Sequence, residues 1–289
     1  MSAPELLAAD LDGTLTAPGA DRIASADLAA LEAAAAQGVL IVIATGRSIR
    51  TSSRHAEQLP VNAPWILHNG ALTVEWPGPA IVAEALLDVE TARRAVALIR
   101  ECGLAPMVFG NPHRGQQVFL ERATTEMERF LALNPGRVEW VGTVENELDS
   151  PPTLISGMAQ RPAAEAAAER LRRELGRAAS VIVMSNGRYG HWSVEVQSPA
   201  CRKDVALREI LEAEGIRPAA VVAIGDEVND VGMLKLAGLG LAMADGRPEA
   251  LAAADGTVVP TPEGRICAAV ERHVLATAPA RVVSDEHAD

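Results

Sequence analysis

Apolar residues gather in short continuous runs, and each run is followed by polar residues. Four runs have this form, and they cover residues 6–9, 39–44, 64–67 and 219–224. A continuous apolar run, in contrast to an alternating one, is typical of a strand that is buried on both faces. The pattern therefore predicts four buried strands, each with polar side chains directly after its last residue.

Helical patterns separate these runs. Residues 25–37, 48–58 and 230–237 each have one, and Ser48 is an N-cap candidate for the second. Strands that alternate with helices predict a parallel sheet with helices on both faces, which is an α/β fold. Ligands of such sheets bind at the carboxyl ends of the strands. We therefore expect the polar residues after the four runs to share one site.

The middle of the chain has a different pattern. Helices are predicted over residues 88–102 and 163–175, with shorter strand patterns between and around them. This predicts a separate α+β domain over residues 85–188, inserted into a core of residues 1–84 and 189–289. Two domains also suit the length of 289 residues.

Composition and charge disfavour several classes of protein. The chain is 48% hydrophobic, so it can bury a core, and its net charge of −12 disfavours nucleic acid and anionic membranes as partners. It shows no signal-peptide pattern and no apolar run of about 20 residues that could span a bilayer. Its three cysteines form no Cys-x-x-Cys pair, so we expect a reduced, cytoplasmic protein. The polar residues 278–289 are expected to be frayed.

The strongest chemical signal is Asp10-Leu11-Asp12-Gly13-Thr14, directly after the first predicted strand. Two acids this close at the end of a buried strand repel each other unless a cation binds them. Mg²⁺ prefers oxygen ligands and would meet that need. One carboxylate could then attack phosphorus while the other transfers a proton. The alternative is a surface turn or helix-capping cluster.

Other metal and nucleotide motifs do not fit. An EF-hand needs Gly two positions after Gly13, and a Glu where the chain has Asp21. The glycines of residues 110–115 suggest a P-loop, but Gln116 replaces the required Lys. The histidines show no His-Glu-x-x-His spacing, so a zinc hydrolase is not supported.

Residues 10–15 resemble the first motif of the haloacid dehalogenase superfamily. Three further segments are similar to its other motifs and follow in the same order along the core. Among them, Gly-Asp-Glu-Val-Asn-Asp at residues 225–230 is similar to the fourth motif of the Cof-type sugar-phosphatase branch. The resemblance implies a Rossmann-like core with a mobile cap domain of type IIB between the second and third motifs. The predicted inserted domain lies in that place.

The resemblance implies a role for each matching residue. Asp10 would be the nucleophile, and Asp12 would protonate the leaving oxygen and then activate water. Mg²⁺ would be held by Asp10, the backbone carbonyl of Asp12 and Asp226. Lys203 would neutralise the phosphate, and Asp230 would act through waters of the metal or hold Lys203.

Four positions would bind phosphate or substrate. Thr45 and the amide of Gly46 would donate to phosphoryl oxygens, although Thr45 also suits a helix N-cap. Asn229 would bind phosphate or a metal ligand. Asn69 would meet the substrate near its phosphate, although Asn-Gly is also a good turn. Arg47 would add positive potential or be an ordinary exposed arginine.

Some positions depart from the pattern or stay open. Asp204 stands where the superfamily usually has Gly, and Arg202 offers a second cation beside Lys203. Asp245 stands where the branch often has Asn, and no role is carried over to it. For four residues of the inserted domain, the sequence does not decide between a surface position and a contact to the leaving group. These residues are His113, Arg114, Arg188 and His191.

The sequence thus predicts a Mg²⁺-dependent phosphatase that acts on a small phosphorylated metabolite, such as a sugar phosphate, through an aspartyl-phosphate. A phosphomutase or phosphotransferase would use the same intermediate on Asp10. A non-catalytic binding protein with this fold is a third hypothesis, and the presence of both Asp10 and Asp12 disfavours it. The substrate and the oligomeric state stay open.

Overall fold

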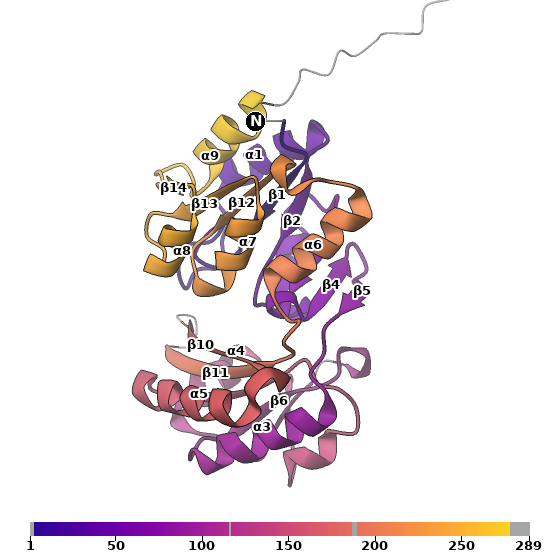
Figure 1. The fold of residues 1–289 in the computed structure, drawn as a ribbon, viewed down its shortest axis with the longest axis vertical. Helices are drawn as coiled ribbons and strands as arrows, with labels where there is room; N and C mark the ends of the chain where they lie inside the picture. The colour runs from indigo at the N-terminus through magenta and orange to yellow at the C-terminus, as the bar shows by residue number, and fades with distance from the viewer. Residues whose placement is uncertain (1–2, 116, 187–189, 278–289) are drawn as a thin grey trace, which may run out of the picture. The chain divides into compact units, whose positions relative to one another are not determined.

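The computed structural model describes residues 3–115, 117–186 and 190–277. These residues divide into two compact units (Figure 1). We call them the core unit, which comprises Met1–Asn69, Thr73–Val82 and Lys203–Asp289, and the cap unit, which comprises Gly70–Leu72 and Ala83–Arg202. The expected fraying of residues 278–289, and the candidate Arg188, lie outside the described residues.

The core unit is built on a parallel sheet with the strand order β14-β13-β12-β1-β2. A parallel bridge between Ala44 and Ile66 places β3 beyond β2. A smaller sheet has the strand order β3-β4-β5, so β4 pairs with both β3 and β5. The strands are β1 (Leu6–Ala9), β2 (Leu40–Ile43), β3 (Trp65–Leu67), β4 (Leu72–Glu75), β5 (Ala80–Glu84), β12 (Val221–Gly225), β13 (Leu239–Met243) and β14 (Gly256–Val258). All four residues of β1 are buried, as its continuous apolar run predicts.

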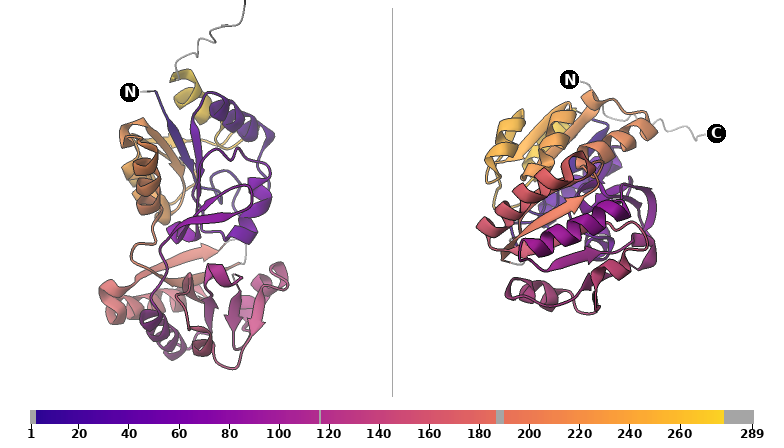
Figure 2. Two further views of the ribbon diagram at one scale, coloured as in Figure 1. Left: turned by 90° about the vertical axis from the view of Figure 1, so that its right-hand side faces the viewer. Right: turned by 60° about the horizontal axis from the view of Figure 1, so that its bottom comes forward.

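Helices cover both faces of this sheet (Figures 1 and 2). Apolar residues of α6 (Lys203–Glu214), α7 (Val231–Leu236) and α8 (Pro248–Ala253) form one cluster with side chains of β1, β2 and β12. On the other side, α1 (Ser25–Ala36) contacts α9 (Cys267–His273). The remaining helix is α2 (Ile49–Ala56). This arrangement confirms the predicted α/β fold, in which strands are covered on both faces.

The cap unit has its own sheet, with the strand order β10-β11-β9-β6-β7-β8. Its strands are β6 (Pro106–Phe109), β7 (Val118–Leu120), β8 (Val138–Trp140), β9 (Leu154–Ala159), β10 (Ser180–Asn186) and β11 (His191–Gln197). Helices α3 (Val89–Glu101) and α5 (Arg161–Leu175) bury one shared apolar cluster against it, and α4 (Glu128–Leu133) belongs to a second cluster. No helix in the described part of the chain is both long and apolar enough to cross a membrane.

The expected boundary at the end of the inserted domain needs a correction. The two units divide between Arg202 and Lys203, whereas the sequence pattern placed the division between residues 188 and 189. The reason is that β11 pairs with β10 on one side and with β9 on the other, so it completes the cap sheet. Residues 187–189, which include the expected division, are outside the described residues. The entry boundary lies between Val82 and Ala83, two positions from the one expected.

Candidate active site

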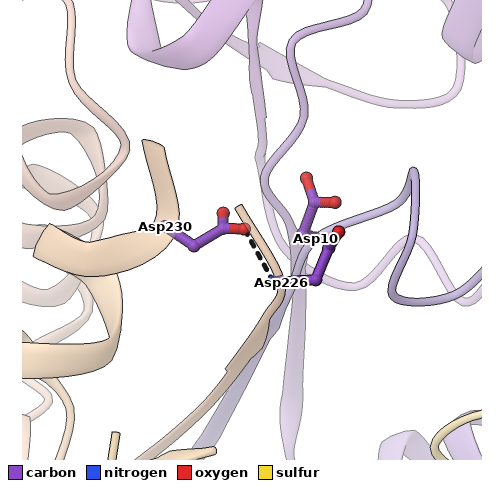
Figure 3. A group of neighbouring side chains, drawn as sticks. All are labelled: Asp10, Asp226 and Asp230. Atoms are coloured by element: carbon purple, nitrogen blue, oxygen red, sulfur yellow. Dashed lines mark hydrogen bonds between the residues drawn. The ribbon is translucent and has the colours of Figure 1, made fainter. Parts of the chain in front are cut away.

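Three acidic side chains converge at the carboxyl ends of neighbouring strands. Asp10 follows β1 and donates its backbone amide to the carbonyl of Ile224 in β12 at 2.9 Å, and Asp226 follows β12. Asp230 ends the short 3-10 turn Val228–Asp230 before α7. One oxygen from each of Asp10, Asp226 and Asp230 lies within 4.8 Å of the others. Figure 3 shows the three side chains together. The topology therefore brings together acids that lie far apart in sequence.

The turn after Asp12 makes room for Asp226. Gly13 has a positive φ of 93°, and a Cβ at this position would collide with the carboxylate of Asp226. The hydroxyl of Thr14 donates to Oδ1 of Asp226 at 2.9 Å. The Gly-Thr pair of the first motif thus has a structural reason, because it lets Asp226 approach Asp10 and then holds it.

Lys203 is buried between two of the acids. It is the first residue of α6, and its Nζ donates to Oδ1 of Asp10 at 2.5 Å and to Oδ1 of Asp230 at 2.6 Å. Burial alone would lower the pKa of Lys203, but the two carboxylates outweigh burial and raise it. Lys203 is therefore a charged ammonium in contact with the proposed nucleophile.

Both carboxylate oxygens of Asp230 accept hydrogen bonds from other residues of the protein. Oδ1 accepts from Lys203, and Oδ2 accepts from the backbone amides of Asp226 and Glu227, each at 3.0 Å. The residue is fully buried. These contacts match one of the two roles expected for it, which is to hold Lys203. They also fix the turn that carries Asp226.

The charges of this group suit a divalent cation. Burial raises the pKa of Asp10 well above its ordinary value, Lys203 opposes this, and Asp230 and Asp226 add to it. Burial and then Asp230 likewise raise the pKa of Asp226 to about 7. With all groups ionised, three carboxylates and one ammonium give −3 + 1 = −2. A hard cation with charge +2 and a preference for oxygen ligands would balance this excess.

Asp12 lies apart from the acidic group. Its carboxylate accepts two hydrogen bonds from Arg47, at 2.7 Å from Nε and at 2.5 Å from Nη2. Arg47 is only 8% exposed, and it also forms an ion pair with Asp21 at 2.9 Å. Arg47 is thus a buried partner of acids, and the expectation of an ordinary exposed arginine is wrong. The Asp12 side chain is 45% exposed, so it can still meet a ligand.

Thr45 does not cap the helix that follows it. The N-cap of α2 is Ser48, which forms a capping box with Thr51. Thr45 is fully buried, and its hydroxyl accepts from the amide of Arg47 at 3.1 Å. The structure therefore assigns capping to Ser48, and the role of Thr45 as a phosphate ligand stays a prediction.

The two asparagines lie together beside the second motif. Nδ2 of Asn229 donates to Oδ1 of Asn69 at 2.8 Å, and the backbone amide of Asn69 donates to the carbonyl of Thr45 at 3.0 Å. A Cβ at Gly46 would lie 2.9 Å from Oδ1 of Asn69. The predicted phosphate-binding positions Thr45, Gly46, Asn69 and Asn229 are therefore neighbours, although they come from three separate segments.

The comparison with known proteins agrees with this arrangement. The sequence profile of the haloacid dehalogenase-like hydrolases matches residues 7–266. The chain belongs to this family. The assignment made from the four motifs, and with it the assignment as a phosphatase-type hydrolase, is confirmed.

Relatives of this haloacid dehalogenase-like hydrolase span most of its length. The 5-amino-6-(5-phospho-D-ribitylamino)uracil phosphatase YitU of Bacillus subtilis is 25% identical over 255 residues, which are 84% of this chain and 87% of YitU. A phosphoglycolate phosphatase of Archaeoglobus fulgidus is 26% identical over 265 residues, or 91% and 94% of the two chains. The structure of the subclass IIB sugar phosphatase BT4131 superimposes with a TM-score of 0.75 at 23% identity, over 93% of this chain and 98% of that one.

The cap candidates of this hydrolase have local partners. Nε2 of His113 lies 2.8 Å from Oε2 of Glu84, and Nη1 of Arg114 lies 2.5 Å from Oδ2 of Asp149. Nδ1 of His191 lies 3.4 Å from Nε2 of Gln160. These contacts lie within the cap unit, so they give none of the three a role in reading a leaving group.

Two arginines near the first motif were missed or misread from the sequence. Arg47 had a signal, because it follows β2 by four residues and so lies near the same edge of the sheet as Asp12. Arg265 had none. It donates to the carbonyls of Gly13 and Thr14 from a position about 250 residues further along the chain, and no motif marks it.

Proposed function

We propose that this protein is a Mg²⁺-dependent phosphatase that hydrolyses a small phosphorylated metabolite, a sugar phosphate or a similar phosphomonoester, through a phosphorylated Asp10. One observation carries the proposal. The buried carboxylate of Asp10 contacts the ammonium of Lys203 and lies beside the carboxylate of Asp226 from the adjacent strand. This arrangement supports the proposal, because the residues proposed as nucleophile, phosphate-binding cation and second metal ligand are neighbours.

The residues divide the chemistry between them. An oxygen of Asp10 would attack phosphorus while the bond from phosphorus to the leaving oxygen breaks. Lys203 would offset charge on the phosphoryl oxygens, because its ammonium is already 2.5 Å from Asp10. A Mg²⁺ ion held by Asp10, Asp226 and the carbonyl of Asp12 would act as a Lewis acid toward the phosphoryl group.

Asp12 would move the protons. Its carboxyl would give a proton to the leaving oxygen, and the resulting carboxylate would take one from the water that hydrolyses the aspartyl-phosphate. Arg47 donates to both oxygens of the ionised carboxylate, so one of these two hydrogen bonds would have to give way when Asp12 carries the proton. Such proton transfer typically contributes about 10²–10⁴ in rate. The small phosphorylated compounds in the names of YitU and the phosphoglycolate phosphatase support a substrate of this size.

Phosphate release over a panel of phosphomonoesters tests the proposal. The panel would contain sugar phosphates, phosphoglycolate, nucleotides and cofactor phosphates, each ranked by kcat/KM with Mg²⁺ and with a chelator. We expect free phosphate from at least one compound with Mg²⁺, loss of release with the chelator, and recovery on adding Mg²⁺ back. An isomerised sugar phosphate in place of free phosphate would identify a mutase.

The variant Asp10→Asn tests the nucleophile with little expected effect on folding. It removes one charge and is expected to lower kcat by at least about 10³-fold, because an amide oxygen is a poor nucleophile. Glu32→Gln on the exposed face of α1 is the matched control, since it also removes one carboxylate. Full turnover in Asp10→Asn, or no phosphate release by the wild type from any compound, would refute the proposal.

A further inference from the structure

An arginine from the C-terminal part of the core unit contacts the turn of the first motif. Nε of Arg265 donates to the carbonyl of Thr14 at 3.0 Å, and Nη2 donates to the carbonyl of Gly13 at 2.5 Å. Nη2 also lies 3.0 Å from both carboxylate oxygens of Asp245. The side chain of Arg265 is 13% exposed and that of Asp245 is 45% exposed. One mostly buried guanidinium thus joins three segments.

The backbone at Arg265 is fixed by a buried acid from α1. Asp27 is fully buried, and its carboxylate accepts from the amides of Arg265, Ile266 and Cys267, each at 2.8 Å. Gly264 leaves space for it, because a Cβ there would lie 2.5 Å from Oδ1 of Asp27. Since the backbone is held on one side, the guanidinium of Arg265 has a defined place from which to reach Gly13 and Thr14.

The two carbonyls that Arg265 holds belong to the residues that place Asp226. Gly13 leaves the space into which the carboxylate of Asp226 fits, and Thr14 donates to that carboxylate at 2.9 Å. If the turn shifts, the space beside Gly13 and the hydroxyl of Thr14 move with it. Arg265 therefore contacts the backbone of the two residues that place Asp226, the acid beside Asp10.

Asp245 gives the arginine its orientation. It stands where the Cof-type branch often has Asn, and a carboxylate can pair with a guanidinium where a neutral amide offers a single acceptor oxygen. Both oxygens of Asp245 are used in this way. The pairing with Arg265 thus gives a structural reason for Asp in place of Asn at position 245.

We propose that Arg265, oriented by Asp245, is a positioning residue for the metal site: it keeps the Gly13–Thr14 turn in the conformation in which Asp226 and Asp10 share one divalent cation. The inference rests on the proposed function in so far as these two acids hold the metal. Arg265 acts through the turn, so its loss should weaken metal binding and leave the substrate KM at saturating metal unchanged.

Binding of Mn²⁺ to the full-length protein without substrate tests this inference. Mn²⁺ also takes oxygen ligands and is counted directly by electron paramagnetic resonance. We expect Arg265→Met to raise the Kd for Mn²⁺ about tenfold, since hydrogen bonds from a charged donor to the turn are lost. Asp245→Asn keeps one acceptor and should raise it only about two- to threefold. The matched control is Arg272→Met, an exposed arginine of α9, which should leave the Kd unchanged.

The outcomes separate positioning from a merely structural role. A lowered thermal midpoint with an unchanged Mn²⁺ affinity in Arg265→Met would overturn the inference. If that variant does not fold, Arg265→Lys and Asp245→Asn replace it, and wild-type Mn²⁺ affinity in both would overturn the inference equally. Failure of the proposed function looks different: a wild type that binds Mn²⁺ through Asp226 but releases no phosphate leaves the inference standing. A wild type that binds no Mn²⁺ overturns both.

Discussion

At the scale of single residues, several side chains at the candidate site are held by more than one neighbour. Asp230 contacts Lys203 with one oxygen and two backbone amides with the other. Arg47 pairs with both Asp12 and Asp21. A substitution at one of these residues will therefore also disturb its partners, and double-mutant comparisons are needed to separate the effects.

Thr45 and Ser48 lie three residues apart, and only Ser48 caps α2, so variants of the two can separate the proposed phosphate contact from helix capping. Thr45→Val removes a hydroxyl without changing shape, and we expect kcat/KM to fall about 10- to 100-fold through loss of a bond to a charged phosphoryl group. Ser48→Ala removes the N-cap of α2 and should cost about 1 kcal/mol of stability with kcat/KM nearly unchanged. Activity and thermal unfolding measured on both variants check this, and equal kcat/KM values would count against the role of Thr45.

The sequence could place the acids but not all of their partners. Asp10 and Asp226 each follow a buried strand, and parallel strands bring their ends to one edge of the sheet. The pairing of Arg47 with Asp12 could not be predicted in this way, because a long flexible side chain near a strand end can reach several acids or solvent. The contact of Arg265 with Gly13 depends on the packing of α1 against α9, which no local pattern encodes.

At the scale of elements, β11 explains why one domain boundary was missed. Val194 and Val196 belong to the apolar cluster of α3 and α5, while Ser193 and Glu195 alternate with them on the other face of the sheet. Alternation of apolar and polar side chains is typical of strands in antiparallel sheets. The search for continuous apolar runs finds the parallel core strands and passes over such a strand.

Glu195 on this second face should make stability depend on pH. Burial raises the pKa of Glu195 from 4.5 to about 7. Because the folded-state pKa is the higher one, its contribution to stability is complete below the unfolded pKa and is lost as pH rises through about 7. We expect the thermal midpoint of the wild type to fall relative to Glu195→Gln between about pH 5 and pH 8.

Thermal unfolding of both proteins at the two pH values measures this difference. The exposed Glu139→Gln on β8 is the control, and its midpoint should follow the wild type at both pH values. A difference between wild type and Glu195→Gln that stays constant from low to high pH would show that Glu195 does not titrate in the folded state in this range.

At the scale of the whole molecule, the residues proposed for the chemistry all belong to one of the two units. The proposed catalytic, metal and phosphate ligands all belong to the core unit, while the cap unit has apolar clusters of its own. The order of the four motifs along the chain was enough to predict the family, which the family match confirms. The substrate was not predictable, because the cap candidates fit surface positions as well as contacts to a leaving group. Of these candidates, His113 and Arg114 pair with nearby acids.

Trapping the phosphorylated protein tests the role of Asp10 more directly than turnover does. A nitrophenyl phosphate suits this test, because its electron-withdrawing nitro group lets the leaving group depart as a phenolate without a proton. Asp12→Asn can therefore still be phosphorylated but cannot activate water. After rapid acid quench, peptide mapping should find an acid-stable, hydroxylamine-sensitive phosphoryl group on the peptide with Asp10. The group should be absent when Asp10→Asn is added to Asp12→Asn. A phosphoryl group on another residue, or none in a variant that still binds the aryl phosphate and Mg²⁺, would contradict nucleophilic attack by Asp10.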